Sequence, residues 1–347
     1  MGSKEFDEFD PTIERLSALL DLKPLGRYRL ALDGTKPEGA GIRIHFYERG
    51  ATRLKFISIY WSPITRAFKE GLYEADLLHT TDTRAAINSR IRESVVLEGF
   101  GDIFALSDAA TCRRVFELFE LATLLQFVPY ETYVEGMILT GVGAPPTPAL
   151  RQRSVFITGS FGSKLTQEFL ANYAGMLRTG QSFLRNDQTY LLRNDHPNGE
   201  TLSVDVRAVR YPRDLRSSLL QREYYWYALS NQLVLLQHHT FDPFVEETAQ
   251  PTPRPPERDV LTAPGTPRRE LIEHSTLVSF FDPNDVIGFR IPPRRVDGAP
   301  FAREVYNVAV PVVERHSAIV KLADPEQAHN GAKAHPIVLR AIALGWE

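Results

Sequence analysis

Three kinds of side chain in this sequence could together carry out nucleophilic acyl transfer. A serine, Ser160, follows a short apolar run at residues 155–157. Two carboxylates, Asp282 and Asp285, follow a second apolar run, and His329 comes later in the chain. A hydroxyl can attack a carbonyl carbon when a histidine takes its proton and a carboxylate orients that histidine. Serine, aspartate, histidine is one of the chain orders in which such triads occur.

Ser160 has the sequence context of a sharp turn between a strand and a helix. Residues 155–157 form the β-branched and aromatic run typical of a buried strand. The small-residue segment 158–162 follows directly, and from Lys164 to Met176 apolar residues recur at helical spacing. A serine on such a turn can be held in a strained conformation with its hydroxyl clear of the sheet.

The segment 157–164, Ile-Thr-Gly-Ser-Phe-Gly-Ser-Lys, resembles the nucleophile elbow of the α/β-hydrolase superfamily, in particular that of lipases and esterases. Those elbows often read hydrophobic-Thr-His-Ser-Leu-Gly-Ser-Arg. Thr158 stands where the usual pattern has its first glycine, and Gly159 stands where it often has histidine. The resemblance implies a mostly parallel sheet with helices on both faces and Ser160 as the nucleophile. It also implies that the backbone N–H of Phe161 donates to the oxyanion.

The same resemblance assigns the acid and the base. Lipase-like relatives often carry the acid as Asn-Asp followed by an apolar pair and then a proline, and the sequence around Asp285 resembles this pattern. Asp285 is therefore preferred to Asp282, which fits the role of an Asx residue in a turn. In this superfamily the base lies in the loop before the last helix. His329 is thus the candidate base, with His316 and His335 as alternatives.

One feature of the superfamily has no counterpart near the start of this chain. A strand ending in His-Gly usually supplies a second donor to the oxyanion, and residues 1–54 contain no His-Gly. Either the N-terminal strands of the fold are lacking, or the donor comes from another segment. The turn at Trp61 and Ser62, which ends the strand predicted over residues 54–60, is the nearest candidate.

Composition and charge are those of an ordinary globular protein. The 347 residues are 43% hydrophobic and carry a formal net charge of -3. This balance does not indicate a nucleic-acid partner, which would call for a clustered basic surface. Cys112 is the only cysteine, so no disulfide can form within the chain and a cytoplasmic protein is expected. We find no signal peptide and no run of about 18 apolar residues that would predict a membrane span.

A single α/β domain is expected over residues 1–347. Alternation predicts strands near 28–32, 42–47, 54–60, 277–281 and 306–310, and helical spacing predicts helices near 13–20, 82–96, 111–127 and 336–344. The run 224–236 fits either a helix or a central strand. A polar segment at about 186–213 predicts a surface insertion or hairpin, and a Pro-rich segment at about 248–269 predicts an extended surface loop.

The helix predicted near 111–127 is strongly apolar. Glu117 and Glu120 are expected on the side opposite its apolar face. The helix has no face rich in lysine and arginine, as a helix lying on a membrane surface would have. It is therefore expected to pack across the sheet.

Together these patterns predict a serine ester hydrolase that acts on a small-molecule or lipid ester and uses no cofactor or metal. Its triad would be Ser160, His329 and Asp285. The alternative is an inactive hydrolase fold that serves as a binding or scaffold protein. Whether the three side chains lie close together in the fold distinguishes the active hydrolase from this alternative. A nucleotide-binding α/β protein would carry G-x-G-x-x-G or a Gly-Lys-Ser/Thr loop, and neither motif is present.

Overall fold

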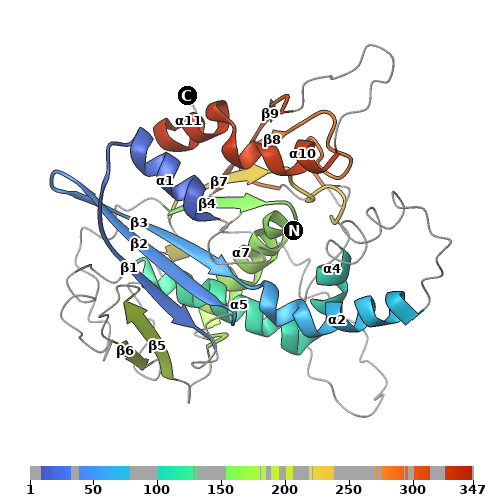
Figure 1. The fold of residues 1–347 in the computed structure, drawn as a ribbon, viewed down its shortest axis with the longest axis horizontal. Helices are drawn as coiled ribbons and strands as arrows, with labels where there is room; N and C mark the ends of the chain where they lie inside the picture. The colour runs from blue at the N-terminus through green and yellow to red at the C-terminus, as the bar shows by residue number, and fades with distance from the viewer. Residues whose placement is uncertain are drawn as a thin grey trace.

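Two separate β-sheets with helices around them make up the described part of the chain (Figure 1). The larger sheet is antiparallel and the smaller one is parallel. The mixed α/β composition predicted from the sequence is therefore confirmed. The computed structural model describes residues 9–32, 39–78, 100–127, 130, 154–179, 181–184, 189–194, 201–205, 219–220, 222–237, 271, 275–292, 294–295, 301–312 and 325–345.

The antiparallel sheet has five strands in the order β3-β2-β1-β5-β6. Strands β2 and β3 form a hairpin whose turn contains Gly50 at φ 58, a left-handed conformation that glycine adopts readily. The predicted hairpin in the polar segment is also present, as β5 and β6, and it extends the sheet from β1. The strand bounds are Lys23–Ala31 for β1, Gly41–Arg49 for β2, Thr52–Tyr60 for β3, Thr189–Asn194 for β5 and Thr201–Asp205 for β6.

The parallel sheet has four strands in the order β4-β7-β8-β9, which is also their order along the chain. Its two central strands, β7 and β8, are nearly continuous runs of buried residues, as strands covered on both faces are. Of the run 224–236, whose type the sequence left open, the first six residues form the central strand β7, and turn residues follow it. The bounds are Ser154–Gly159 for β4, Tyr224–Leu229 for β7, Ser275–Phe281 for β8 and Glu304–Ala309 for β9.

The expectation of one mostly parallel sheet is wrong for the first three strands. Strands β1, β2 and β3 pair with one another in the antiparallel sheet and make no ladder with β4. A tight turn joins β2 to β3, and strands joined in this way pair antiparallel because a parallel partner needs a longer crossover connection. Alternation predicted where these strands lie, but it carries no information about their partners.

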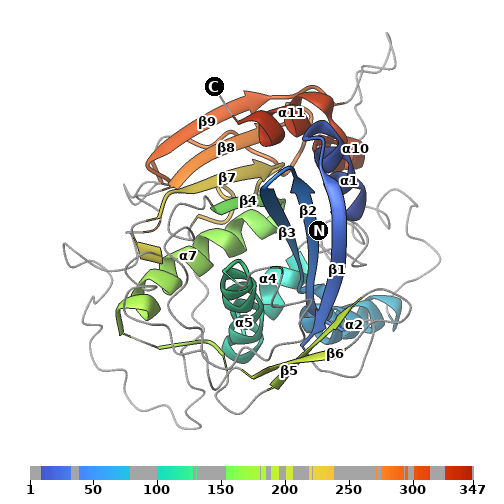
Figure 2. The same cartoon turned by 90° about the vertical axis from the view of Figure 1, so that its left-hand side faces the viewer.

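Helices lie on both sides of the parallel sheet (Figures 1 and 2). On one side is α7, and on the other α11 packs on β7 and β8 through a cluster that includes Val338 and Phe280. No helix within the described ranges is both long and apolar enough to cross a membrane. The bounds are Asp10–Leu19 for α1, Ser62–Leu78 for α2, Gly101–Ala105 for α4, Ala109–Leu125 for α5, Phe161–Thr179 for α7, Pro325–Asn330 for α10 and Pro336–Leu344 for α11. The helix predicted near 82–96, the Pro-rich loop at 248–269 and His316 lie outside the described residues.

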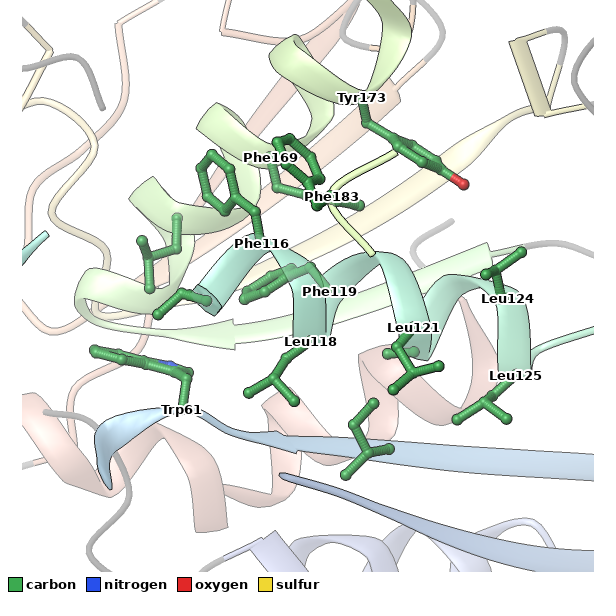
Figure 3. Close-up of a cluster of buried hydrophobic side chains, with 14 of the residues drawn as sticks. Trp61, Phe116, Leu118, Phe119, Leu121, Leu124, Leu125, Phe169, Tyr173 and Phe183 are labelled. Atoms are coloured by element: carbon green, nitrogen blue, oxygen red, sulfur yellow. The ribbon is translucent and has the colours of Figure 1, made fainter. Parts of the chain in front are cut away.

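An aromatic cluster between α5 and α7 anchors the helix that begins after Ser160 (Figure 3). Phe169 stacks on Tyr173 with ring centroids 4.8 Å apart and lies 5.3 Å from Phe119. Phe183 lies 5.4 Å from Phe116. Such pairs contribute about 0.5–1.5 kcal/mol each beyond the area that they bury. The long helix α7 is thereby held against the core along its length, and its first turn is held with it.

The two glutamates of α5 are buried, contrary to the expectation that they would lie opposite its apolar face. Glu117 accepts a hydrogen bond from the hydroxyl of Tyr190. Glu120 accepts hydrogen bonds from the Ser182 hydroxyl at 2.9 Å and the Phe183 N–H at 2.6 Å. Both sides of α5 are covered, so these carboxylates are tolerated because polar partners reach them. Helical periodicity cannot reveal partners that lie more than 60 residues away.

Replacing Glu120 by Ala is expected to lower the free energy of unfolding by on the order of 3 kcal/mol, because buried donors at residues 182–184 would lose their shared acceptor. Urea unfolding measures the change. The matched control, Glu120→Gln, keeps the size and one acceptor oxygen and should lose less. Equal unfolding midpoints for wild type and Glu120→Ala would contradict the prediction.

Candidate active site

The carboxyl ends of the four parallel strands meet at one edge of the sheet, and the segments beyond them stay paired for one more residue. The Ser160 N–H donates to the Leu229 carbonyl at 2.9 Å, and the Ser230 N–H donates to the Phe280 carbonyl at 2.8 Å. This edge is where ligands bind in open α/β sheets. The predicted nucleophile and the predicted acid, Asp285, follow β4 and β8 at this edge.

Ser160 occupies a strained position between β4 and α7. Its φ is 50, in the left-handed region that a residue with a Cβ rarely adopts, and its side chain is buried. Helix α7 begins at the next residue, Phe161. The backbone N–H of Phe161 therefore lies at the positive end of the helix dipole, which favours negative charge. The predicted turn is present, with a strained φ at Ser160. The strand before it was expected to be buried, and this is wrong: β4 is the edge strand of the parallel sheet and only Ser154 in it is fully buried, because a single strand, β7, pairs with it.

Thr158, the departure from the glycine of the usual elbow, is accommodated by hydrogen bonds. Its hydroxyl accepts from the indole N–H of Trp226 at 2.6 Å and lies 2.9 Å from the hydroxyl of Ser163. It thus connects β4 to β7 and to the first turn of α7. A Cβ added to Gly159 would lie 3.5 Å from the Lys333 side chain, which is ordinary contact.

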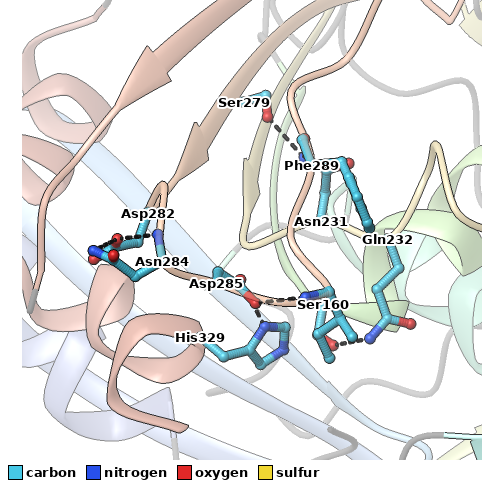
Figure 4. Close-up of polar contacts among 10 residues, drawn as sticks. Ser160, Asn231, Gln232, Ser279, Asp282, Asn284, Asp285, Phe289 and His329 are labelled. Carbon is cyan, nitrogen blue, oxygen red and sulfur yellow. Dashed lines mark hydrogen bonds and ion pairs between the residues drawn. The ribbon is translucent and has the colours of Figure 1, made fainter. Parts of the chain in front are cut away.

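His329 and Asp285 form a buried pair beside Ser160 (Figure 4). Nδ1 of His329 lies 2.8 Å from Oδ2 of Asp285, and the other carboxylate oxygen accepts from the Ile287 N–H at 3.0 Å. Nε2 of His329 is buried and has no hydrogen-bond partner among the described residues. In Figure 4 this edge of the imidazole is directed toward Ser160. The three predicted side chains lie at one edge of the sheet, but no hydrogen bond joins His329 to Ser160 among the described residues. His329 was expected in a loop, but it lies in the short helix α10. The catalytic roles of the three residues stay predictions.

The alternative acid and one alternative base have structural roles. Asp282 accepts from the Asn284 N–H and from the Val312 N–H, both at 2.7 Å, which holds the turn after β8 as an Asx residue does. His335 precedes α11 and accepts from the Ile337 N–H at 3.3 Å, so it caps that helix. Neither side chain contacts Ser160 among the described hydrogen bonds.

The pKa of Asp285 lies below its usual value. Burial acts to raise the pKa of this carboxyl, but the hydrogen bond and charge of His329, together with two backbone N–H groups, outweigh it. A carboxylate whose pKa is depressed in the folded state stabilises the fold at pH values above its unfolded pKa of about 3.9. This contribution is lost as the pH falls through the pKa of the folded state.

Wild type is therefore expected to lose more stability between pH 5 and pH 3 than the variant Asp285→Asn, whose side chain does not titrate. The proton that Asp285 binds on unfolding in this range accounts for the difference. Urea midpoints at the two pH values measure it. A variant with the same pH dependence as wild type would show that Asp285 contributes nothing to acid unfolding.

Gln232 is part of the site and was missed from the sequence. Its side-chain amide donates a hydrogen bond to Oγ of Ser160 at 2.9 Å, and the residue is buried. It follows β7, three residues beyond the end of that strand. A glutamine in the turn after a strand has no distinctive sequence signal, and the two residues are 72 positions apart. Only the parallel pairing of β4 with β7 brings them together.

Gly288 was also missed, and it leaves room for the acid. A Cβ at this position would overlap Oδ2 of Asp285 and lie 2.7 Å from its Cγ. Oδ2 is the oxygen that contacts His329. Any larger residue at position 288 must therefore displace the carboxylate or the backbone beside it.

Replacing Gly288 by Ala is expected to lower kcat for an ester substrate by about 10²-fold, the effect that a displacement of about 1 Å can have on a catalytic group. The matched control is Gly175→Ala within α7, where an added Cβ has no atom within 4 Å. The control should keep its activity. Full activity in Gly288→Ala would contradict the close packing.

The turn at Trp61 and Ser62 lies next to the elbow. The Trp61 ring packs edge-on against Phe161 with centroids 6.0 Å apart. The Ser62 hydroxyl accepts from the Lys69 ammonium at 3.4 Å. Neither residue hydrogen-bonds to Ser160 in the part of the chain that the structure describes, so a donor role for this turn stays a prediction.

The described residues contain no group of three or more His, Cys, Asp or Glu side chains that could hold a metal ion. Cys112 is buried within α5. Comparisons with protein-family models, with curated proteins and with solved structures each found no match to this chain. Its function is therefore inferred from the side chains of the site.

Proposed function

We propose that this chain is a serine ester hydrolase of the α/β-hydrolase type, with Ser160 as nucleophile, His329 as general base and Asp285 as the orienting acid. The observation that carries the proposal is the arrangement of the three groups at one sheet edge. A buried, positive-φ serine stands beside a buried His–Asp pair whose outer nitrogen has no hydrogen-bond partner among the described residues. Perturbed, strained and desolvated groups of this kind concentrate at active sites.

The order of the elements supports the α/β-hydrolase type. Four parallel strands follow one another in the sheet as in the chain, with the serine after the first, the acid after the third and the histidine after the fourth. Serine, acid, histidine is the order found in that superfamily. Two features depart from the expected sheet: the five-stranded antiparallel sheet is separate, and the serine follows an edge strand, β4.

In the acylation step, the proton of the Ser160 hydroxyl passes to Nε2 of His329 while Oγ bonds to the ester carbonyl carbon. The carbonyl π electrons move to the oxygen, where the N–H of Phe161 stabilises the negative charge. As the double bond re-forms, the alkoxide leaves and takes the proton from His329. Water repeats the sequence on the acyl-enzyme and releases the carboxylic acid. Asp285 holds the imidazole in the required tautomer and favours its charged form.

Labelling with a fluorophosphonate tests the proposal. The wild-type chain is expected to be labelled at Ser160, and Ser160→Ala is expected to remain unlabelled. Ser163→Ala is the matched control, since Ser163 is also buried in the elbow but bonds to Thr158. No labelling of wild type would favour the alternative, an inactive fold that serves as a binding or scaffold protein. Labelling of Ser160→Ala would show that another residue is the nucleophile.

A further inference from the structure

The side chain of Gln232 lies on the opposite side of Ser160 from the imidazole of His329 (Figure 4). Its amide nitrogen is 2.9 Å from Oγ of Ser160. The amide donates into a lone pair of the hydroxyl, which leaves the hydroxyl hydrogen for Nε2 of His329. His329 thus faces the hydrogen of the Ser160 hydroxyl, and Gln232 binds its oxygen.

The loop that presents Gln232 is rigidly held. Ser230 has φ 48, a strained value for a residue with a side chain. Asn231 is completely buried, and its amide nitrogen donates to the Ser279 hydroxyl at 2.7 Å and the Phe289 carbonyl at 3.0 Å. The Asn231 carboxamide oxygen accepts from the Leu233 N–H at 3.2 Å. Backbone strain that buried hydrogen bonds of neighbouring residues hold in place is typical of a functional position.

We propose that Gln232 supplies the second donor of the oxyanion hole, through its side-chain amide rather than a backbone N–H. This inference rests on the proposed function. Once Oγ has bonded to the carbonyl carbon, the oxyanion is only two bonds from Oγ. The Gln232 amide, which hydrogen-bonds to Oγ of Ser160, can therefore reach the oxyanion through a rotation of the Gln232 side chain. Gln232 then supplies the second oxyanion donor, which a His-Gly loop supplies in the α/β-hydrolase superfamily. The first donor is the N–H of Phe161 at the start of α7.

A donor aimed at the oxyanion acts on the transition state more than on the bound ester. Replacing Gln232 by Leu, which keeps the shape and removes the donor, is expected to lower kcat for p-nitrophenyl butyrate by about 10²–10³-fold with little change in KM. Gln232→Glu is expected to be slower still, because a carboxylate would face the developing negative charge.

The comparison of these two variants separates catalysis from anchoring. Suppose that Gln232 only held the Ser160 hydroxyl in place. A glutamate at position 232 could then still hold this hydroxyl by accepting a hydrogen bond from it, whereas a leucine could not. Gln232→Glu would therefore be faster than Gln232→Leu. The matched control is Gln181→Leu, an exposed glutamine beyond the far end of the 19-residue helix α7, about 28 Å from its start. Thermal unfolding of each variant shows whether the fold is kept.

The outcomes are distinct. A wild-type chain that neither reacts with a fluorophosphonate nor hydrolyses the ester overturns the proposed function and this inference with it. A reactive wild type with an equally fast Gln232→Leu variant overturns this inference alone, as does a Gln232→Glu variant that is faster than Gln232→Leu. A slow Gln232→Leu and a slower Gln232→Glu, both folded, support it.

Discussion

Replacing Ser160 by Ala or His329 by Ala is expected to lower kcat for p-nitrophenyl butyrate by about 10⁶-fold, and the double variant is expected to be no slower than either single one. The nucleophile and its base act as one unit, so removing either removes the whole covalent route. The closeness of the His329 imidazole to Ser160 and its pairing with Asp285 motivate this expectation. Steady-state kinetics of the three variants measure the effect.

Two results would contradict this account of the base. If His329→Ala kept most of its activity, another group would have to take the proton of Ser160. If the single losses multiplied in the double variant, the two side chains would act independently. His335→Ala is the matched control, because this histidine caps α11 and lies outside the triad. The control should keep kcat and lose about 1 kcal/mol of stability at most.

Replacing Asp285 by Asn is expected to lower kcat by about 10⁴-fold with the fold intact. The carboxylate accepts from Nδ1 of His329 at 2.8 Å and so leaves Nε2 unprotonated and able to take the serine proton. An asparagine amide directed at Nδ1 would favour the opposite tautomer, in which Nε2 carries the proton. The loss should appear in kcat and in the rate of fluorophosphonate labelling.

Asp282→Asn is the control for this variant, since it makes the same chemical change three residues away. Asp282 holds the turn through backbone N–H groups, so its replacement should cost roughly 1–3 kcal/mol of stability and leave kcat within a few-fold of wild type. If Asp282→Asn were inactive and Asp285→Asn active, the acid of the triad would be Asp282 and not Asp285.

Several features of this protein were determined locally, and the sequence alone was sufficient for them. The apolar run, the small-residue turn and the helical spacing around Ser160 predict a strand, a bend and a helix, and β4, Ser160 and α7 have this form. The last helix, α11, has the predicted bounds. Such features depend on side-chain periodicity and turn chemistry within a few residues of one another. The resemblance to a known elbow added a chain order, which made Asp285 and His329 worth considering.

Other features were decided only by tertiary structure. The separation of the strands into two sheets, the burial of Glu120 and the contact of Gln232 with Ser160 all depend on segments far apart in the chain. Periodicity shows which face of an element is apolar but not which element covers it, and a polar residue gives no local sign of its partner. The parallel pairing of the edge strand β4 with β7 places Gln232 on Ser160. The space at Gly288 is likewise required only because Asp285 turns back toward it.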